Sequence, residues 1–146
     1  MSARVRVPEG WDESRGGVVD CAAAVLVAAG WANVFVRPPA AWLCAEPIVL
    51  TCGAWERDAR TPGGEERGLR SVDVLVCREG AAEAEAACRG VELDLRTRDW
   101  EGLGDGWRCR VAAVDSDAPS PRGRDASGRW LWGFTLLLRV VRDLDG

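Results

Sequence analysis

Two aspartates are the residues of this sequence whose type and spacing come nearest to a catalytic or metal-binding pattern. Asp115 and Asp117 stand in "VDSDAP", at the predicted end of a strand, where carboxylates often bind a metal ion. A D-x-D pair is a weak signal, because aspartates are also frequent in solvated turns. A metal-dependent enzyme is therefore only a minor alternative. We predict no catalytic residue and a protein that is not an enzyme.

Histidine and cysteine usage narrows the chemistry further. The absence of histidine excludes Ser-His-Asp and Cys-His catalysis and zinc sites that contain histidine. No cysteine pair has C-x-x-C spacing, and most cysteines lie in apolar runs, as reduced, buried side chains of cytosolic proteins do. Whether any of them pair stays open. We predict no metal and no cofactor. The six cysteines are Cys21, Cys44, Cys52, Cys77, Cys88 and Cys109.

Length and charge indicate one domain over residues 1–146 that is not dominated by a phosphate-binding face. A chain of this size buries about 68–70% of its unfolded surface, enough for a core without disulfides or metals. The net charge is −4. The first residues lack the apolar stretch of a secretion signal, and the apolar run 18–29 is too short to span a bilayer. We therefore expect no membrane contact.

The hydrophobic periodicity predicts an α+β fold with a mixed or antiparallel sheet of four to five strands and two helices on one face. The first helix is apolar nearly all round, so its second side is covered either by the core or by a partner subunit. The last strand is apolar on both faces, which favours a strand covered on both sides. The expected helices are 18–29 and 81–96, and the expected strands are 33–39, 48–54, 69–79, 107–115 and 129–141.

The segment 54–70 joins two predicted strands and carries four acidic and four basic residues. A nucleic-acid loop would be net basic and a calcium loop net acidic, and a phosphate loop would lead into a helix. Balanced charge around Pro62, Gly63 and Gly64 favours a long β-hairpin arm with its turn at these residues. A surface loop is the alternative. An arm of this kind would grip a neighbouring subunit through Arg–carboxylate pairs, with Trp55 as an anchor.

The order of these elements resembles that of the tail-terminator and minor tail proteins of long-tailed bacteriophages. The matching features are an N-terminal helix, "VFVRPP", the strand–arm–strand "WERDARTPGGEERGLRSVDVLVCRE", a helix with "EAE", and the closing "LWGFTLLLRVVRD". The similarity covers residues 18–143 and lies in order and character. The sequence departs from the family by Trp in place of Tyr, a longer final loop and a short second helix, so a related head–tail joining or neck protein stays open.

This resemblance implies a structural virion protein, assembled in the host cytoplasm, that forms a hexameric ring at the head-proximal end of a phage tail. The ring would terminate the tail tube and join it to the neck. Its partners would be its own copies, the tail tube protein and a neck or connector protein, and DNA would pass through it without specific binding. The resemblance places inter-subunit contacts in the arm, at Trp55, Arg57, Arg60, Glu65, Glu66 and Arg67.

The second long loop, at about 115–127, would face the tail tube or the neck through Asp115, Asp117, Arg122 and Arg124. An alternative function is a small cytosolic module that binds a protein or ligand with a Trp-rich surface. Eight tryptophans are many for this length, although most tryptophans pack in cores. The candidate surface residues are Trp42, Trp55, Trp100, Trp107 and Trp130.

Overall fold

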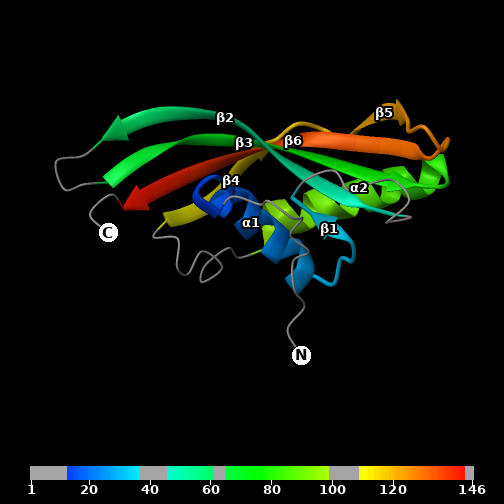
Figure 1. Cartoon of the computed structure of the whole chain (residues 1–146), viewed down its shortest axis with the longest axis horizontal. Helices are drawn as coiled ribbons and strands as arrows, with labels where there is room; N and C mark the ends of the chain where they lie inside the picture. Colours follow the sequence, from blue (N-terminus) through cyan, green and yellow to red (C-terminus); the bar gives the residue numbers. More distant parts are fainter. Residues whose placement is uncertain (1–12, 37–45, 61–64, 99–108, 144–146) are drawn as a thin grey trace.

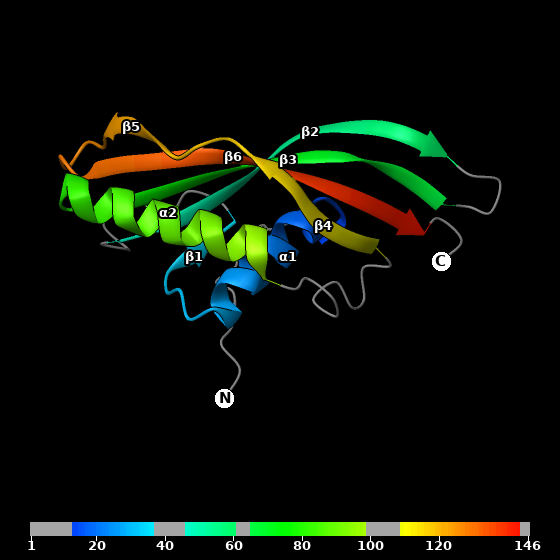
Figure 2. The same ribbon diagram turned by 180° about the vertical axis from the view of Figure 1, so that it is seen from behind.

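The computed structural model describes residues 13–36, 46–60, 65–98 and 109–143. They form one sheet with both helices on the same side of it (Figures 1 and 2), which confirms the predicted α+β fold. The elements, in chain order, are α1 (Glu13–Ala28), β1 (Val34–Phe35), β2 (Ile48–Arg60), β3 (Glu65–Arg78), α2 (Ala81–Thr97), β4 (Cys109–Ser116), β5 (Ser120–Arg124) and β6 (Trp130–Asp143).

The sheet has the strand order β1-β2-β3-β6-β4, and β5 pairs with β6 beyond the end of β4. β1 runs parallel to β2, and all other pairs are antiparallel, so the sheet is mixed as predicted. Its six strands exceed the predicted four to five. The additional strand is "SPRGR", which has too little apolar character to be distinguished from a loop by periodicity.

Alternate residues of the three central strands form the core face of the sheet. Val72, Val74 and Val76 of β3 are 0–2% exposed, as their alternation predicts. The register places Val74 between Leu50 of β2 and Phe134 of β6, so the buried side chains form continuous rows beneath the sheet. The core therefore lies between the sheet and the two helices.

The opposite face of the sheet is more open. Asp73 is exposed there, and Leu75 and Leu137 are half-buried. None of the described helices lies on this side in either view (Figures 1 and 2). The prediction that the last strand is covered on both faces is therefore wrong for the described elements. Its outward leucines are partly shielded within the sheet surface and face no second layer.

Helix α1 is buried by its own chain. The side chains of Ala22, Ala23, Val25 and Leu26 are at most 1% exposed, and they lie on more than one side of the helix. These residues therefore leave no apolar side for a partner subunit, and the central-core alternative holds for them. Gly30 ends the helix as predicted: with φ of 98° its N–H donates to the Val27 carbonyl, in a Schellman arrangement.

Helix α2 is the predicted amphipathic helix. Ala84, Cys88, Val91 and Leu95 are fully buried against the sheet. On its outer side, the expected pairs Glu85–Arg89 and Glu92–Arg96 are formed, with N–O distances of 3.1 and 2.8 Å.

A glycine within α2 lets α1 approach it. The Trp31 ring, just after α1, lies where a β-carbon on Gly90 would be 3.0 Å away, and its Nε1–H donates to Asp94 at 2.7 Å. The glycine that weakens the helix by about 1 kcal/mol therefore makes room for the indole that joins the two helices.

Candidate functional site

The arm exists as the antiparallel hairpin of β2 and β3, but it is wider than predicted. β3 is paired with β6 along its whole length, from Arg78 opposite Trp130 to Glu65 opposite Asp143. β4 continues the sheet on the other side of β6, with Cys109 opposite Arg142. The predicted hairpin is therefore present as part of a wider sheet, because the last strand pairs with it up to the end of β3.

At this end of the sheet β2, β3, β6 and β4 lie side by side, and we call it the distal sheet. The six arm residues lie in it. Trp55, Arg57 and Arg60 belong to β2, and Glu65, Glu66 and Arg67 belong to β3. The register pairs Arg60 with Glu66 across the hairpin. Their side chains, and the predicted turn at Pro62–Gly64 within residues 61–64, lie outside the described part of the chain.

The distal sheet has two edges without a neighbouring strand among the described residues. β1 pairs only with Ile48 and Val49, so the outer edge of β2 is unpaired from residue 50 to residue 60. On the opposite side, β4 pairs only with β6. The edge of β2 extends beyond the helices, as the left half of Figure 1 shows, whereas β4 contacts α2 and its Ser116 hydroxyl donates to Glu92. Unpaired strand edges offer a row of N–H and C=O groups to another chain.

The two aspartates of the D-x-D pair have local roles in the sheet. Asp117 fills the gap between β4 and β5: its carboxylate accepts the N–H of Thr135, and its own N–H donates to the Thr135 carbonyl at 3.1 Å. Asp115 accepts the N–H of Ser116 at 2.9 Å. Within the described residues, no three side chains are grouped as a metal site would require.

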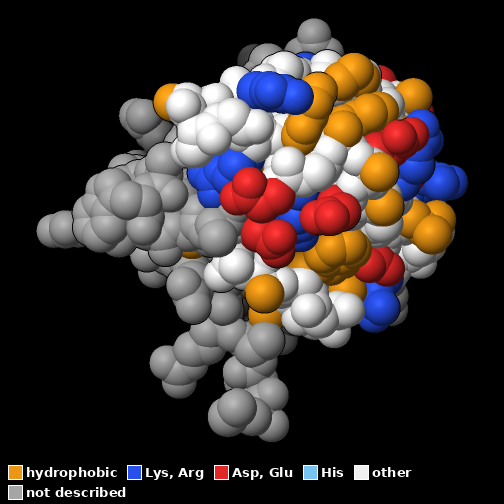
Figure 3. Space-filling view, turned by 90° about the vertical axis from the view of Figure 1, so that its right-hand side faces the viewer, with side chains coloured by type: hydrophobic (Ala, Val, Ile, Leu, Met, Phe, Trp, Pro, Cys, Tyr) orange, Lys and Arg blue, Asp and Glu red, His pale blue; other side chains and the backbone are white. Residues whose placement is uncertain are grey.

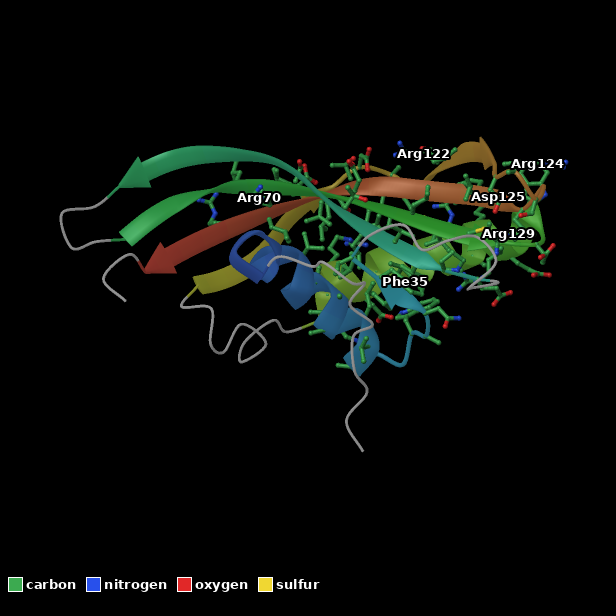
Figure 4. All side chains as sticks on the ribbon, viewed as in Figure 1. Phe35, Arg70, Arg122, Arg124, Asp125 and Arg129 are labelled. Carbon is green, nitrogen blue, oxygen red and sulfur yellow. The ribbon has the colours of Figure 1, made fainter. Side chains whose placement is uncertain are left out.

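The predicted second loop at 115–127 is mostly sheet, and this prediction is also corrected. β4 extends through Ser116, and β5 places Arg122 and Arg124 on a strand at the opposite end of the sheet from the arm (Figures 1 and 4). Only Asp125 and the residues after it make the turn into β6. The loop residues predicted to act together are therefore divided between a structural pair of aspartates and an arginine-bearing strand.

Both arginines of β5 are exposed, and each side chain packs against a residue of β6. The Arg124 guanidinium lies 4.0 Å from the centre of the Trp130 ring, a cation–π contact. The stem of Arg122 lies over Gly133, where a β-carbon would come within 3.4 Å of its Cγ and Nε and within 2.7 Å of the Val74 carbonyl oxygen. In the described part of the chain, neither guanidinium has a carboxylate at ion-pair distance.

A buried ion pair closes the β5–β6 turn, and the sequence did not single it out. Arg129, only 6% exposed, donates from Nε to Asp125 Oδ2 at 2.7 Å. Asp125 also accepts the N–H groups of Ser127 and Arg129, and Cys77 of β3 directs its thiol to the same carboxylate. The D-x-x-x-R spacing, with Gly128 at φ of 83°, is the signal that could have indicated this turn.

The contacts around Asp125, Arg129 and Cys77 shift the pKa values of these groups. Burial by itself would raise the pKa of Asp125, but the hydrogen bonds from the Arg129 backbone and side chain lower it below its ordinary value. Burial raises the pKa of the Cys77 thiol to about 11, and the nearby Arg129 only partly opposes this. Burial likewise raises the pKa of the Cys88 thiol to about 12. Both cysteines are therefore unreactive, protonated thiols at neutral pH.

The structure does not assemble a Trp-rich surface from the described residues. Trp42, Trp100 and Trp107, and the side chain of Trp55, lie outside them, which leaves Trp130 beside Arg124. On the end of the molecule that Figure 3 presents, hydrophobic, basic and acidic side chains are interspersed.

No described helix is long and apolar enough to cross a membrane. Comparison with protein-family models and with curated proteins finds no match to this chain.

Proposed function

We propose that this protein is a ring-forming structural subunit, the tail terminator of a long-tailed phage or a related head–tail joining protein. The observation that carries this proposal is the pair of unpaired edges on opposite sides of the distal sheet. Two different surfaces that meet head to tail between identical copies generate a ring when the rotation closes. A long edge without protection is a liability for a monomer, and pairing it with another copy removes that liability.

The two edges match in direction. β2 and β6 run one way and β3 and β4 the other, because each neighbouring pair is antiparallel. When copies are related by rotation without a flip, β4 of one copy therefore lies antiparallel to β2 of the next. This arrangement gives the ordinary antiparallel ladder of hydrogen bonds.

The two edges also match in level and in shape. Through β3 and β6, Arg60 of β2 is level with Cys109 of β4, and Cys52 is level with Ser116. Each edge has a register shift at the level of Leu137 and Leu138, after Cys52 in β2 and after Ala113 in β4, and β2 has a second shift after Arg57. An irregularity at the same height on both edges suits them to each other.

The test is native mass measurement across a wide range of protein concentration, with negative-stain images of the largest species. The proposal expects closed rings, near six copies of the 15.8 kDa chain if the resemblance holds. Open fibres would contradict ring closure. A strict monomer at every concentration, also after addition of tail tubes, would contradict the proposal and favour the alternative of a monomeric binding module.

A further inference from the structure

The outer edge of β5 is a third edge that pairs with none of the described strands, and the proposed ring contact does not use it. Ser120 of β5 is opposite Gly133, which is opposite Leu75 and, through it, Val49 of β2. At that level β2 is already paired with β1, through Phe35. A neighbouring copy that adds its free β2 edge to β4 would therefore leave β5 uncovered. This step rests on the proposed function.

The β5 edge carries two arginines without a carboxylate partner among the described residues. Five other described arginines have a carboxylate partner, whereas Arg139 of β6 has none among the described residues: the pairs are Arg78 with Glu46, Arg89 with Glu85, Arg96 with Glu92, Arg98 with Asp94, and Arg129 with Asp125. Arg122 and Arg124 have none among the described residues, although the chain as a whole has a net charge of −4. β5 thus carries two exposed arginines close together in sequence on a chain that does not favour anions over its whole surface.

The two guanidinium groups are also restrained before any partner binds. Arg124 is stacked on Trp130, and the stem of Arg122 occupies the space that only a glycine at position 133 leaves. A side chain that is already held loses less conformational entropy when it forms a new ion pair. Figure 4 shows both arginines on the β5 side of the molecule, away from the helices.

We infer that the β5 edge binds an extended acidic segment of another protein, added to the sheet as a further strand. Main-chain hydrogen bonds to the free edge would supply part of the affinity. A register shift between Pro121 and Arg124 separates the two arginines: Arg122 lies against Gly133 on one face of the sheet, and Arg124 lies against Trp130 on the other. Carboxylates at neighbouring positions of the added strand, one on each face, would pair with them. For a tail terminator, such a segment would belong to the component that docks at this end of the ring.

Calorimetric titration with a capped heptapeptide that carries two adjacent glutamates between valines tests the inference on the full chain. We expect saturable binding, about tenfold or more weaker for the variant Arg122→Gln/Arg124→Gln. The matched control is Arg139→Gln, which removes an exposed arginine from β6 and should change the affinity by less than about twofold. N-methylation at alternate peptide residues should weaken binding because it blocks strand pairing.

Three results would overturn the inference: no binding at millimolar peptide, equal binding by the double variant, or tighter binding of oligothymidylate that displaces the peptide. The last result would identify a phosphate site. Titration at a concentration where the protein is monomeric separates this inference from the ring. Peptide binding without rings would contradict the proposed function only, and rings without peptide binding would contradict the β5 site only.

Discussion

The half of the sheet that the helices cover and the half that extends beyond them are built differently. Among the side chains that the structure describes, the buried core includes Leu50, Val72 and Leu138, and the strands continue past them to Arg60, Glu65 and Asp143. One face of the covered half is closed by α1 and α2 (Figure 2). The distal half has two unpaired edges among the described strands. The comparison indicates that one half stabilises the fold and that the other is available for association.

The largest effect is expected in the covered half. Replacement of Phe134 by alanine should lower the free energy of unfolding by about 3–5 kcal/mol, because this ring is 1% exposed and its removal leaves a cavity between β6 and the helices. Urea unfolding measures the change. The control is Leu93→Ala on α2, at a side chain 51% exposed, which should stay within about 0.5 kcal/mol. Equal effects at both positions would contradict the location of the core.

A smaller effect is expected at the β5–β6 turn. Asp125→Ala removes the carboxylate that binds the buried Arg129 and two backbone N–H groups, so stability should fall by about 1–3 kcal/mol. Glu85→Ala, which breaks the exposed pair with Arg89, should cost less than about 0.5 kcal/mol. If both substitutions lowered the free energy of unfolding by the same small amount, the contacts of Asp125 would not stabilise the turn as their geometry indicates.

The two buried thiols predict how stability depends on alkaline pH. Their pKa values are raised to about 11 for Cys77 and about 12 for Cys88, from 9.0 in the unfolded chain. Above pH 9 the unfolded chain loses protons that the folded chain keeps, so the free energy of unfolding should fall as pH rises toward 11. Unfolding curves between pH 8 and 11 measure the slope. Cys88→Ala should reduce it, and an unchanged slope would contradict this assignment.

The smallest effect on stability is expected in the distal half. Deletion of Asp58–Arg60 together with Glu66–Arg67 shortens both strands of the hairpin at matched levels of the register. The shortened chain should lose less stability than Asp125→Ala, because none of the core residues that the structure describes is removed. Its ability to assemble should nevertheless be lost, as native mass measurement would reveal. A loss as large as that of Phe134→Ala would mean that the distal sheet belongs to the folding core.

Sequence pattern predicts the elements whose environment is encoded locally. The alternation of Val72, Val74 and Val76 identifies the buried face of β3, and the spacing of Cys88 and Val91 identifies that of α2. Gly30 marks the end of α1, since its positive φ is a local requirement. In each case neighbouring residues carry enough information to define the structure.

The sequence is less informative where the partner is distant in the chain. The pairing of β6 with the arm joins Arg67 to Val141, and nothing in either segment indicates it. β5 has a charged, proline-containing sequence that becomes a strand only because β6 offers a free edge. Because this pairing is not visible in the sequence, the pattern predicts residues 115–127 as one loop with four charged residues. In the structure, two of those residues, Arg122 and Arg124, lie on strand β5.

Hydrogen exchange at individual residues, compared between dilute monomer and assembled protein, tests the central claim most directly. Association through the distal edges predicts that amide protection increases on assembly along 52–60 of β2 and 109–116 of β4. The amides of the outer β5 edge, in 120–124, should remain as exchangeable as in the monomer. Assembly without added protection on β2 and β4, or with protection confined to the helices, would contradict the account.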